Sequence, residues 1–136
     1  MTRVPEMIKA GIRVGFGQDC TLDPWYSLGT ADMLDVAFMG LHVAQMTSPA
    51  DMRRCFDMVT GVNAAIMGLD DYGLEVGKLA SMVVLDAGNP IEAVRLRPER
   101  LAVIARGRLV ATRERQDTKL TLPNRPAQVN RRHKAG

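Results

Sequence analysis

The amino-terminal part of the sequence alternates helical and strand signals in a fixed order. Residues 6–12 (EMIKAGI) have the pattern of a helix end, with Gly11 placed to stop the helix in a left-handed conformation. Apolar side chains then alternate along residues 12–16, as in a short strand. A polar loop follows, and Thr30 is a suitable N-cap for a helix over residues 31–46. Helix, strand, loop and helix in this order predict a βα unit, the repeating part of parallel α/β folds.

A second helix is predicted to begin at residues 48–51 (SPAD). Ser48 can accept a hydrogen bond at the N-cap, Pro49 suits the first helical position, and Asp51 completes a capping box. Gly61 is predicted to break this helix, with a short helical turn after it. The expected buried face consists of Met52, Cys55, Phe56 and Val59.

After Gly77 the periodicity changes from helical to strand-like. Residues 79–86 and 101–112 are rich in aliphatic and β-branched side chains. The second stretch predicts a hairpin with Arg106 and Gly107 at its turn, where the glycine can take a positive φ. We therefore expect antiparallel pairing in this part of the chain.

These patterns divide the chain into three parts. Residues 1–68 carry the βα pattern, and the boundary is placed near Gly68. Residues 69–112 carry the strands. Residues 113–136 are polar and contain prolines, which predicts an extended arm followed by a basic, flexible tail.

The composition is that of an ordinary folded domain. With 136 residues, 46% of them hydrophobic, and a net charge of +3, the chain can bury a core and is close to neutral outside its basic tail. This charge balance argues against a nucleic-acid partner, which needs basic residues on a folded face. The longest apolar stretch falls short of the roughly 20 residues that span a bilayer, and the 2 cysteines fit a reducing cytosol. We therefore expect no membrane partner, no secretion signal and a cytoplasmic location.

Three candidate functional side chains follow the predicted strand at its carboxyl end. Loops converge at that end of parallel α/β folds, so Asp19 can ligate a divalent metal or transfer a proton, although a solvated or loop-capping aspartate is the commoner role. Trp25 can form one wall of a pocket for a flat ligand, or simply anchor the loop. Cys20 can line the same pocket, but no neighbouring His or Lys lowers its pKa, which favours an inert thiol.

Residues 15–46 (GFGQDCTLDPWYSLGTADMLDVAFMGLHVAQM) resemble the region around the last barrel strand in cytosine deaminases of the amidohydrolase superfamily. The run DPWY, with LG and ADML after it, is quite specific to that group. Residues 69–87 (LDDYGLEVGKLASMVVLDA) are similar to the return of that superfamily into a small β-sandwich. The resemblance covers about residues 3–112. It implies an α/β fold, the C-terminal fragment of a (β/α)8 TIM barrel with its last strand and helices, followed by strands of a composite β-sandwich domain.

In that family, water activated by a metal attacks the amino-bearing carbon of cytosine, and ammonia leaves. The resemblance implies that Asp19 is both a metal ligand and the catalytic residue that transfers the proton. It places Cys20 in the substrate site, where the family often has a second aspartate, and Trp25 near the substrate ring. Gln18 stands where histidine is frequent. Iron and zinc both stay open as the divalent metal, because an aspartate ligates either.

The chain has only 2 histidines, whereas the family's metal site uses a His-X-His pair and further histidines. His42 falls within the predicted helix, where a packing or polar-surface role is expected, and His133 lies in the tail. A complete barrel takes about 250 residues. The resemblance therefore implies that the parent protein is a hydrolase of non-peptide carbon–nitrogen bonds, and that this chain is inactive unless it joins the missing barrel portion or associates as an oligomer.

Three functions stay open at this point. The chain is a fragment of an enzyme that acts on a small nucleobase, a remnant or assembly subunit that pairs with a chain carrying the histidines, or an interaction protein acting through its basic tail. Within the enzyme hypothesis, another cyclic amine or amide, such as an aminotriazine or creatinine, is the alternative substrate. Trp25 and the absence of a cationic residue among residues 15–34 favour a neutral, flat heterocycle.

Overall fold

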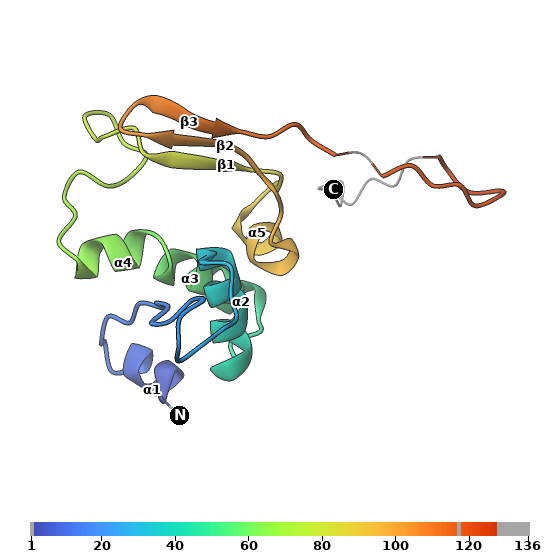
Figure 1. The fold of residues 1–136 in the computed structure, drawn as a ribbon. Helices are drawn as coiled ribbons and strands as arrows, with labels where there is room; N and C mark the ends of the chain where they lie inside the picture. The colour runs from blue at the N-terminus through green and yellow to red at the C-terminus, as the bar shows by residue number, and fades with distance from the viewer. Residues whose placement is uncertain (1, 117, 128–136) are drawn as a thin grey trace.

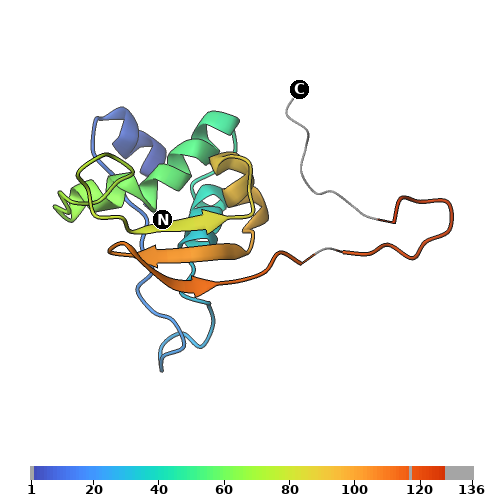
Figure 2. The same cartoon turned by 90° about the horizontal axis from the view of Figure 1, so that it is seen from above.

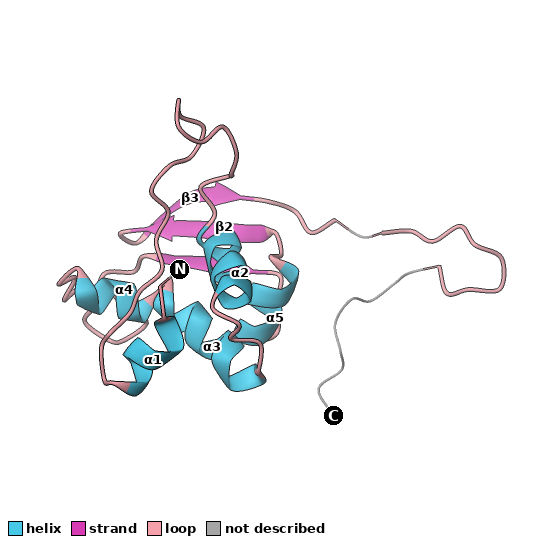
Figure 3. Ribbon diagram, turned by 90° about the horizontal axis from the view of Figure 1, so that it is seen from below, coloured by secondary structure: helices cyan, strands magenta, loops and turns pink. Residues whose placement is uncertain are grey.

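The computed structural model describes residues 2–116 and 118–127, which form a layer of helices beside a small sheet (Figure 1). The helices are α1 (Val4–Lys9), α2 (Met33–Val43), α3 (Pro49–Met58), α4 (Gly61–Ile66) and α5 (Pro90–Leu96). The strands are β1 (Met82–Leu85), β2 (Arg100–Ala105) and β3 (Arg108–Thr112). Figure 3 shows the sheet on one side of the helices, with α1 on the side away from it.

The predicted ends of α1 and α3 are confirmed. After α1 the chain turns at Gly11, which has a φ of 79°. At the start of α3 the Ser48 hydroxyl accepts a hydrogen bond from the Asp51 backbone N–H at 3.2 Å. α4 begins at Gly61, where the break was predicted. Local chemistry therefore explains the end of α1 and the start of α3.

Helix α2 is shorter than the predicted range of residues 31–46, and its predicted cap is wrong. Asp32, rather than Thr30, accepts the capping hydrogen bond from the Leu34 backbone N–H, at 2.8 Å. Ala31 has a φ of 55°, outside the helical region, so the helix cannot start at that residue. At the other end, Gln45 has a φ of 56°, which is also outside the helical region, so the helix does not continue to residue 46.

The strand predicted over residues 12–16 is not formed. These residues have no regular secondary structure, and the sheet of the described chain contains only β1, β2 and β3. A parallel strand needs a hydrogen-bonded neighbour. In its place, the Phe16 N–H donates to the Met58 carbonyl at 3.0 Å, and the Phe16 carbonyl accepts from Asn63 Nδ2 at 2.6 Å.

The sheet has the order β1-β2-β3 and both pairings are antiparallel, as predicted. Val103 in the central strand is paired with Val83 on one side and Ala111 on the other. The hairpin between β2 and β3 turns at Arg106 and Gly107, with φ values of 49° and 77°. Two positive φ values in succession are typical of the turn that matches strand twist, so the predicted hairpin is confirmed.

Helix α5 was not predicted, although its sequence carries a clear start signal. Asn89 Oδ1 accepts from the Glu92 backbone N–H at 3.0 Å, and Pro90 takes the first helical position. The helix brings the fully buried Val94 into the core formed with α1, α2 and α3. The buried members of this core are Val4, Ala37, Leu41, Met46, Cys55, Met58, Val59 and Val94. The domain boundary near Gly68 stays a prediction.

Beyond β3, residues 113–116 and 118–127 contain no helix and lead away from both layers (Figure 1). The basic tail predicted at the carboxyl end falls largely on residues 128–136, outside the described residues. None of the helices in the described ranges combines the length and apolar character that crossing a bilayer requires.

Candidate functional site

The three candidate residues lie on the loop that connects residues 12–16 to α2. Figure 2 shows this loop, in blue, projecting from the helical layer. Asp19 is exposed and Cys20 is half-buried. Trp25 exposes 85% of its surface. A ligand can therefore reach all three side chains.

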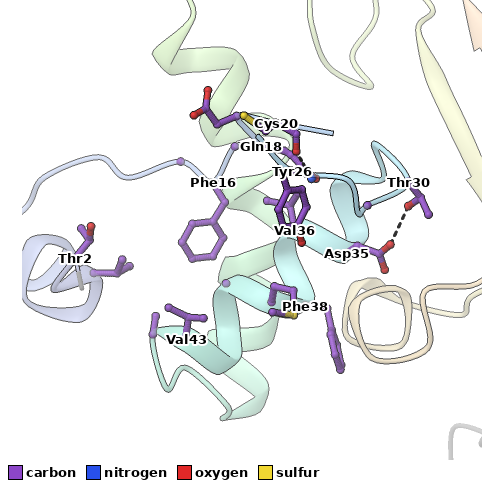
Figure 4. Close-up of a pocket in the computed structure, with 18 of the residues that line it drawn as sticks. Thr2, Phe16, Gln18, Cys20, Tyr26, Thr30, Asp35, Val36, Phe38 and Val43 are labelled. Atoms are coloured by element: carbon purple, nitrogen blue, oxygen red, sulfur yellow. Dashed lines mark hydrogen bonds between the residues drawn. The ribbon is translucent and has the colours of Figure 1, made fainter. Parts of the chain in front are cut away.

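The loop and α2 enclose one open groove of about 1050 Å³, and Asp19, Cys20 and Trp25 all line it. The structure thus brings the three sequence-predicted residues to a common surface. Figure 4 shows the apolar Phe16, Val36 and Val43 along this groove, with polar side chains near its upper end. The polar lining includes Gln18, Thr30, Asp35 and Arg97.

Asp23 organises the loop, and its role was not predicted. Its Oδ1 atom accepts hydrogen bonds from the backbone N–H groups of Trp25 and Tyr26, each at 2.9 Å. The sequence signal was Asp23-Pro24, because aspartate followed by proline favours a tight turn closed by the carboxylate. Asp23 therefore fixes the backbone that presents Trp25 to the groove.

Asp23 also accepts a hydrogen bond from the Cys20 thiol, and the two groups shift each other's pKa in opposite directions. The bond to Asp23, partial burial and the nearby Asp19 charge together raise the pKa of Cys20. The thiol bond, together with backbone N–H donors, lowers the pKa of Asp23. Cys20 is thus held as a neutral thiol, in agreement with the prediction of a poor nucleophile.

Two arginines hold the end of the loop where α2 begins. Arg97 Nε lies 3.0 Å from Asp35 Oδ1, and Arg100 pairs with Asp32, the N-cap residue of α2. Asp35 also accepts a hydrogen bond from the Thr30 hydroxyl at 3.0 Å (Figure 4). Side chains from the residue that follows α5 and from β2 therefore connect the sheet side of the molecule to the site loop.

Asp19 can supply one ligand to a divalent cation. Its carboxylate oxygens are donors that iron and zinc accept, but a catalytic site needs about three protein ligands. Within residues 2–116 and 118–127, no group of three His, Cys, Asp or Glu side chains could hold a metal ion. His42 packs on Phe38, with ring centroids 4.5 Å apart, and its Nδ1 lies 2.7 Å from the Phe38 carbonyl oxygen. His133 lies outside the described residues.

The sequence of residues 1–111 matches the model of the amidohydrolase family. This chain belongs to the amidohydrolase family. Members of this family are hydrolases that act on carbon–nitrogen bonds and are generally metal-dependent. The mixed α/β arrangement with its three-stranded antiparallel sheet resembles the solved structures of this family.

Several relatives of known structure or function are similar to this chain. A 5-methylcytosine deaminase from Klebsiella pneumoniae, solved with phosphonocytosine, is 42% identical with a TM-score of 0.80, over 85% of this chain and 28% of that one. The N-isopropylammelide isopropylaminohydrolase of Burkholderia multivorans ATCC 17616 is 33% identical with a TM-score of 0.77, over 81% of this chain and 28% of that one. The N-isopropylammelide isopropyl amidohydrolase of Pseudomonas sp. (strain ADP) is 32% identical over 112 residues, which are 82% of this chain and 28% of the relative. The chain therefore spans 28% of the length of each of these relatives.

Proposed function

We propose that this chain is the carboxyl-terminal part of a metal-dependent deaminase that hydrolyses cytosine or a close derivative to the corresponding uracil and ammonia. The observation that carries this proposal is the 42% identity and TM-score of 0.80 with the 5-methylcytosine deaminase of Klebsiella pneumoniae. The open groove that collects Asp19, Cys20 and Trp25 supports it, since a flat heterocycle needs an apolar wall and a nearby proton-transfer group.

The proposal assigns residues 1–68 to the last βα unit of a (β/α)8 barrel and residues 69–112 to the sandwich strands. In the complete barrel, residues 12–16, which pair with no strand here, would gain strand neighbours on both sides. The partners are therefore a small nucleobase substrate and the rest of the barrel, supplied in the same polypeptide or by association. The proposal places the protein in the cytoplasm, with neither a nucleic-acid nor a membrane partner.

The chemistry assigned to this chain centres on Asp19. A divalent metal, iron or zinc, supplies the activation of water when it is bound. Asp19 would be one of the residues that hold the metal, and its carboxylate would accept the proton that water loses as it attacks the amino-bearing ring carbon. The same carboxyl group would then give that proton to the amino nitrogen, the carbon–nitrogen bond would break and ammonia would leave. The second proton of the water ends on the adjacent ring nitrogen as the ring carbon becomes a carbonyl.

Trp25 and Cys20 are assigned to substrate binding. The indole of Trp25 offers a broad apolar face on which a neutral flat ring can lie. Because the pKa of Cys20 is raised, its thiol stays protonated, and its neutral sulfur can contact the ring while the S–H group remains bonded to Asp23. Neither role requires a charge, which agrees with a neutral substrate.

An aminotriazine is the alternative substrate, and a specific observation favours it. Two relatives that act on N-isopropylammelide are 32% and 33% identical to this chain and cover it to nearly the same extent as the cytosine deaminase. The two substrates give different products, ammonia from cytosine and isopropylamine from N-isopropylammelide. Identification of the released amine therefore separates the two proposals.

The test is to replace Asp19 with Ala in the complete protein that contains this chain, loaded with iron or zinc. We expect the turnover of cytosine to fall by at least about 100-fold, because the variant loses a proton-transfer group and a metal ligand together. The bound metal, measured by elemental analysis, should fall in parallel. The matched control is Asp57→Ala, at an exposed position on α3 outside the groove, which should keep both properties. If Asp19→Ala retains more than a few per cent of the activity, a different carboxylate transfers the proton.

A further inference from the structure

Phe16 is a fixed point of the backbone three residues before Asp19. Its N–H donates to the Met58 carbonyl at 3.0 Å, and its carbonyl accepts from Asn63 Nδ2 at 2.6 Å. Both partners belong to the junction between α3 and α4, more than 40 positions further along the chain. The junction therefore satisfies both backbone groups of Phe16 in place of a neighbouring strand.

Two close contacts, at Gly15 and at Gly40, also hold the backbone around Phe16 in place. A Cβ atom added to Gly15 would lie 1.8 Å from Asn63 Oδ1, so only glycine lets the Asn63 amide approach the backbone this closely. A Cβ atom added to Gly40 would lie 2.5 Å from the Phe16 ring, so the ring sits directly against the backbone of α2. Figure 4 shows Phe16 pointing along the groove wall toward α2.

The local helix does not explain the presence of an asparagine at position 63. Asn63 lies inside α4, which is only 6 residues long, and asparagine is a weaker helix former than alanine. Its side chain is half-buried and its amide nitrogen bonds a residue 47 positions away in the sequence. The long-range hydrogen bond to Phe16 is therefore the contact that distinguishes this side chain.

We propose that Asn63 is a positioning residue that sets where Asp19 stands in the groove, by holding the Phe16 carbonyl. This inference rests on the proposed function only for the catalytic role of Asp19. The mechanical link from Asn63 through Phe16 to the site loop stands on the contacts alone. Since a reacting group displaced by about 1 Å can lose on the order of 100-fold in rate, a residue distant from the chemistry can act in this way.

The test compares two identical substitutions, Asn63→Asp and Asn89→Asp. Asn63→Asp keeps the size of the side chain but replaces the donor with an oxygen that repels the Phe16 carbonyl. Asn89→Asp keeps the N-cap of α5, because aspartate caps as well as asparagine. In the complete protein we expect Asn63→Asp to lower kcat for the deamination of cytosine by about 10-fold or more, with KM changed by less than about twofold. Asn89→Asp should change neither constant.

Hydrogen exchange gives a second readout that needs no activity. In Asn63→Asp the Phe16 amide should exchange on the order of tenfold faster, while the amides of Ala37 in α2 and Cys55 in α3 keep their rates. A uniform increase at all three amides, or an unchanged Phe16 amide, would overturn the positioning role. If the wild-type protein deaminates none of the tested substrates, the proposed function fails, and the exchange rates still decide the role of Asn63.

Gly15→Ala approaches the same contact from the other side, without changing Asn63. The added methyl group should displace the Asn63 amide and reproduce both the fall in kcat and the faster exchange of the Phe16 amide. Gly61→Ala is the matched control, since a Cβ atom there meets no atom within 4 Å and its φ is not positive. If Gly15→Ala behaves like Gly61→Ala, the close approach of Asn63 does not hold Phe16.

Discussion

At the scale of single residues, the site loop is controlled by an aspartate other than the proposed catalytic one. Asp19 is exposed, whereas Asp23 closes the turn through two backbone N–H groups and the Cys20 thiol. The two carboxylates thus differ in environment: Asp19 is exposed to a ligand and contacts the Cys20 thiol of the loop, whereas Asp23 also binds the loop backbone. An Asp-Pro sequence within a site loop is a useful signal for the second role.

The thiol of Cys20 provides a direct test of the Asp23 contact. Because its pKa is raised, less thiolate is present at any given pH, so alkylation of Cys20 by iodoacetamide should be slower than that of an ordinary exposed cysteine. Asp23→Asn removes the charged acceptor and should lower the pKa of Cys20, which makes alkylation faster at the same pH. Asp57→Asn should leave the rate unchanged. Mass spectrometry of peptides separates Cys20 from the buried Cys55, whose pKa is raised to about 11.

An alkylation rate in Asp23→Asn equal to that of the wild type would show that the thiol does not bond to Asp23. A slower rate would contradict the assigned direction of the pKa shift. The pH dependence of the rate measures the pKa of Cys20 in each variant. The contact is therefore tested without any assumption about the substrate.

At the scale of secondary structure, helix starts follow from short capping sequences. α3 begins after Ser48 and α5 after Asn89, and in both helices proline follows the cap residue. The side chain of each cap residue accepts from the backbone N–H three positions later. The same chemistry thus starts both helices, although only α3 was predicted, because residues 69–112 were interpreted as strands throughout.

Replacing Ser48 with Ala should destabilise α3. The Asp51 N–H loses its acceptor, and an N-cap serine contributes about 1 kcal/mol to the free energy of unfolding. The effect appears as a lower midpoint of thermal unfolding, compared with the wild type at matched protein concentration. Ser48→Thr keeps the hydroxyl and is the control, with a smaller effect expected. A midpoint for Ser48→Ala equal to that of the wild type would mean that the cap does not stabilise the folded chain.

At the scale of the whole molecule, large apolar side chains remain exposed on a chain that spans 28% of the length of the relatives described above. Leu74 exposes 79% of its surface and Trp25 85%, and the groove beside α2 has an apolar wall. β1 and β3 are both edge strands of the three-stranded sheet. Exposed edges and apolar patches are typical sites of association.

We therefore expect the isolated chain to self-associate or to unfold readily. Sedimentation velocity over a range of concentrations should show species larger than the monomer, or the circular dichroism spectrum should show a poorly ordered chain. Addition of the remaining barrel polypeptide should suppress the association. A monomer with a sharp, reversible thermal transition would contradict this expectation.

Short sequence patterns predicted the turns and the helix cap that depend only on neighbouring residues. Gly11, the Ser48 cap and the turn at Arg106 and Gly107 were identified because each depends on residues within a few positions along the chain. The resemblance of residues 15–46 identified the family and the loop that carries Asp19. The turns and the cap depend on the backbone conformation of a few consecutive residues, which neighbouring residues control.

The tertiary structure decided everything that depends on distant partners. The alternating residues 12–16 do not pair, since a strand forms only where another strand accepts its hydrogen bonds. The cap of α2 falls on Asp32, which pairs with Arg100 from the sheet, rather than on Thr30. Asn63, which we propose positions Asp19, contacts the Phe16 carbonyl, and the sequence offered no signal for this contact because residues 47 positions apart have no period or spacing to reveal it.

Sequence by itself determined the family, the turns at Gly11 and at Arg106 and Gly107, and the Ser48 cap, because each depends on neighbouring residues. Three-dimensional packing determined which backbone groups found distant partners.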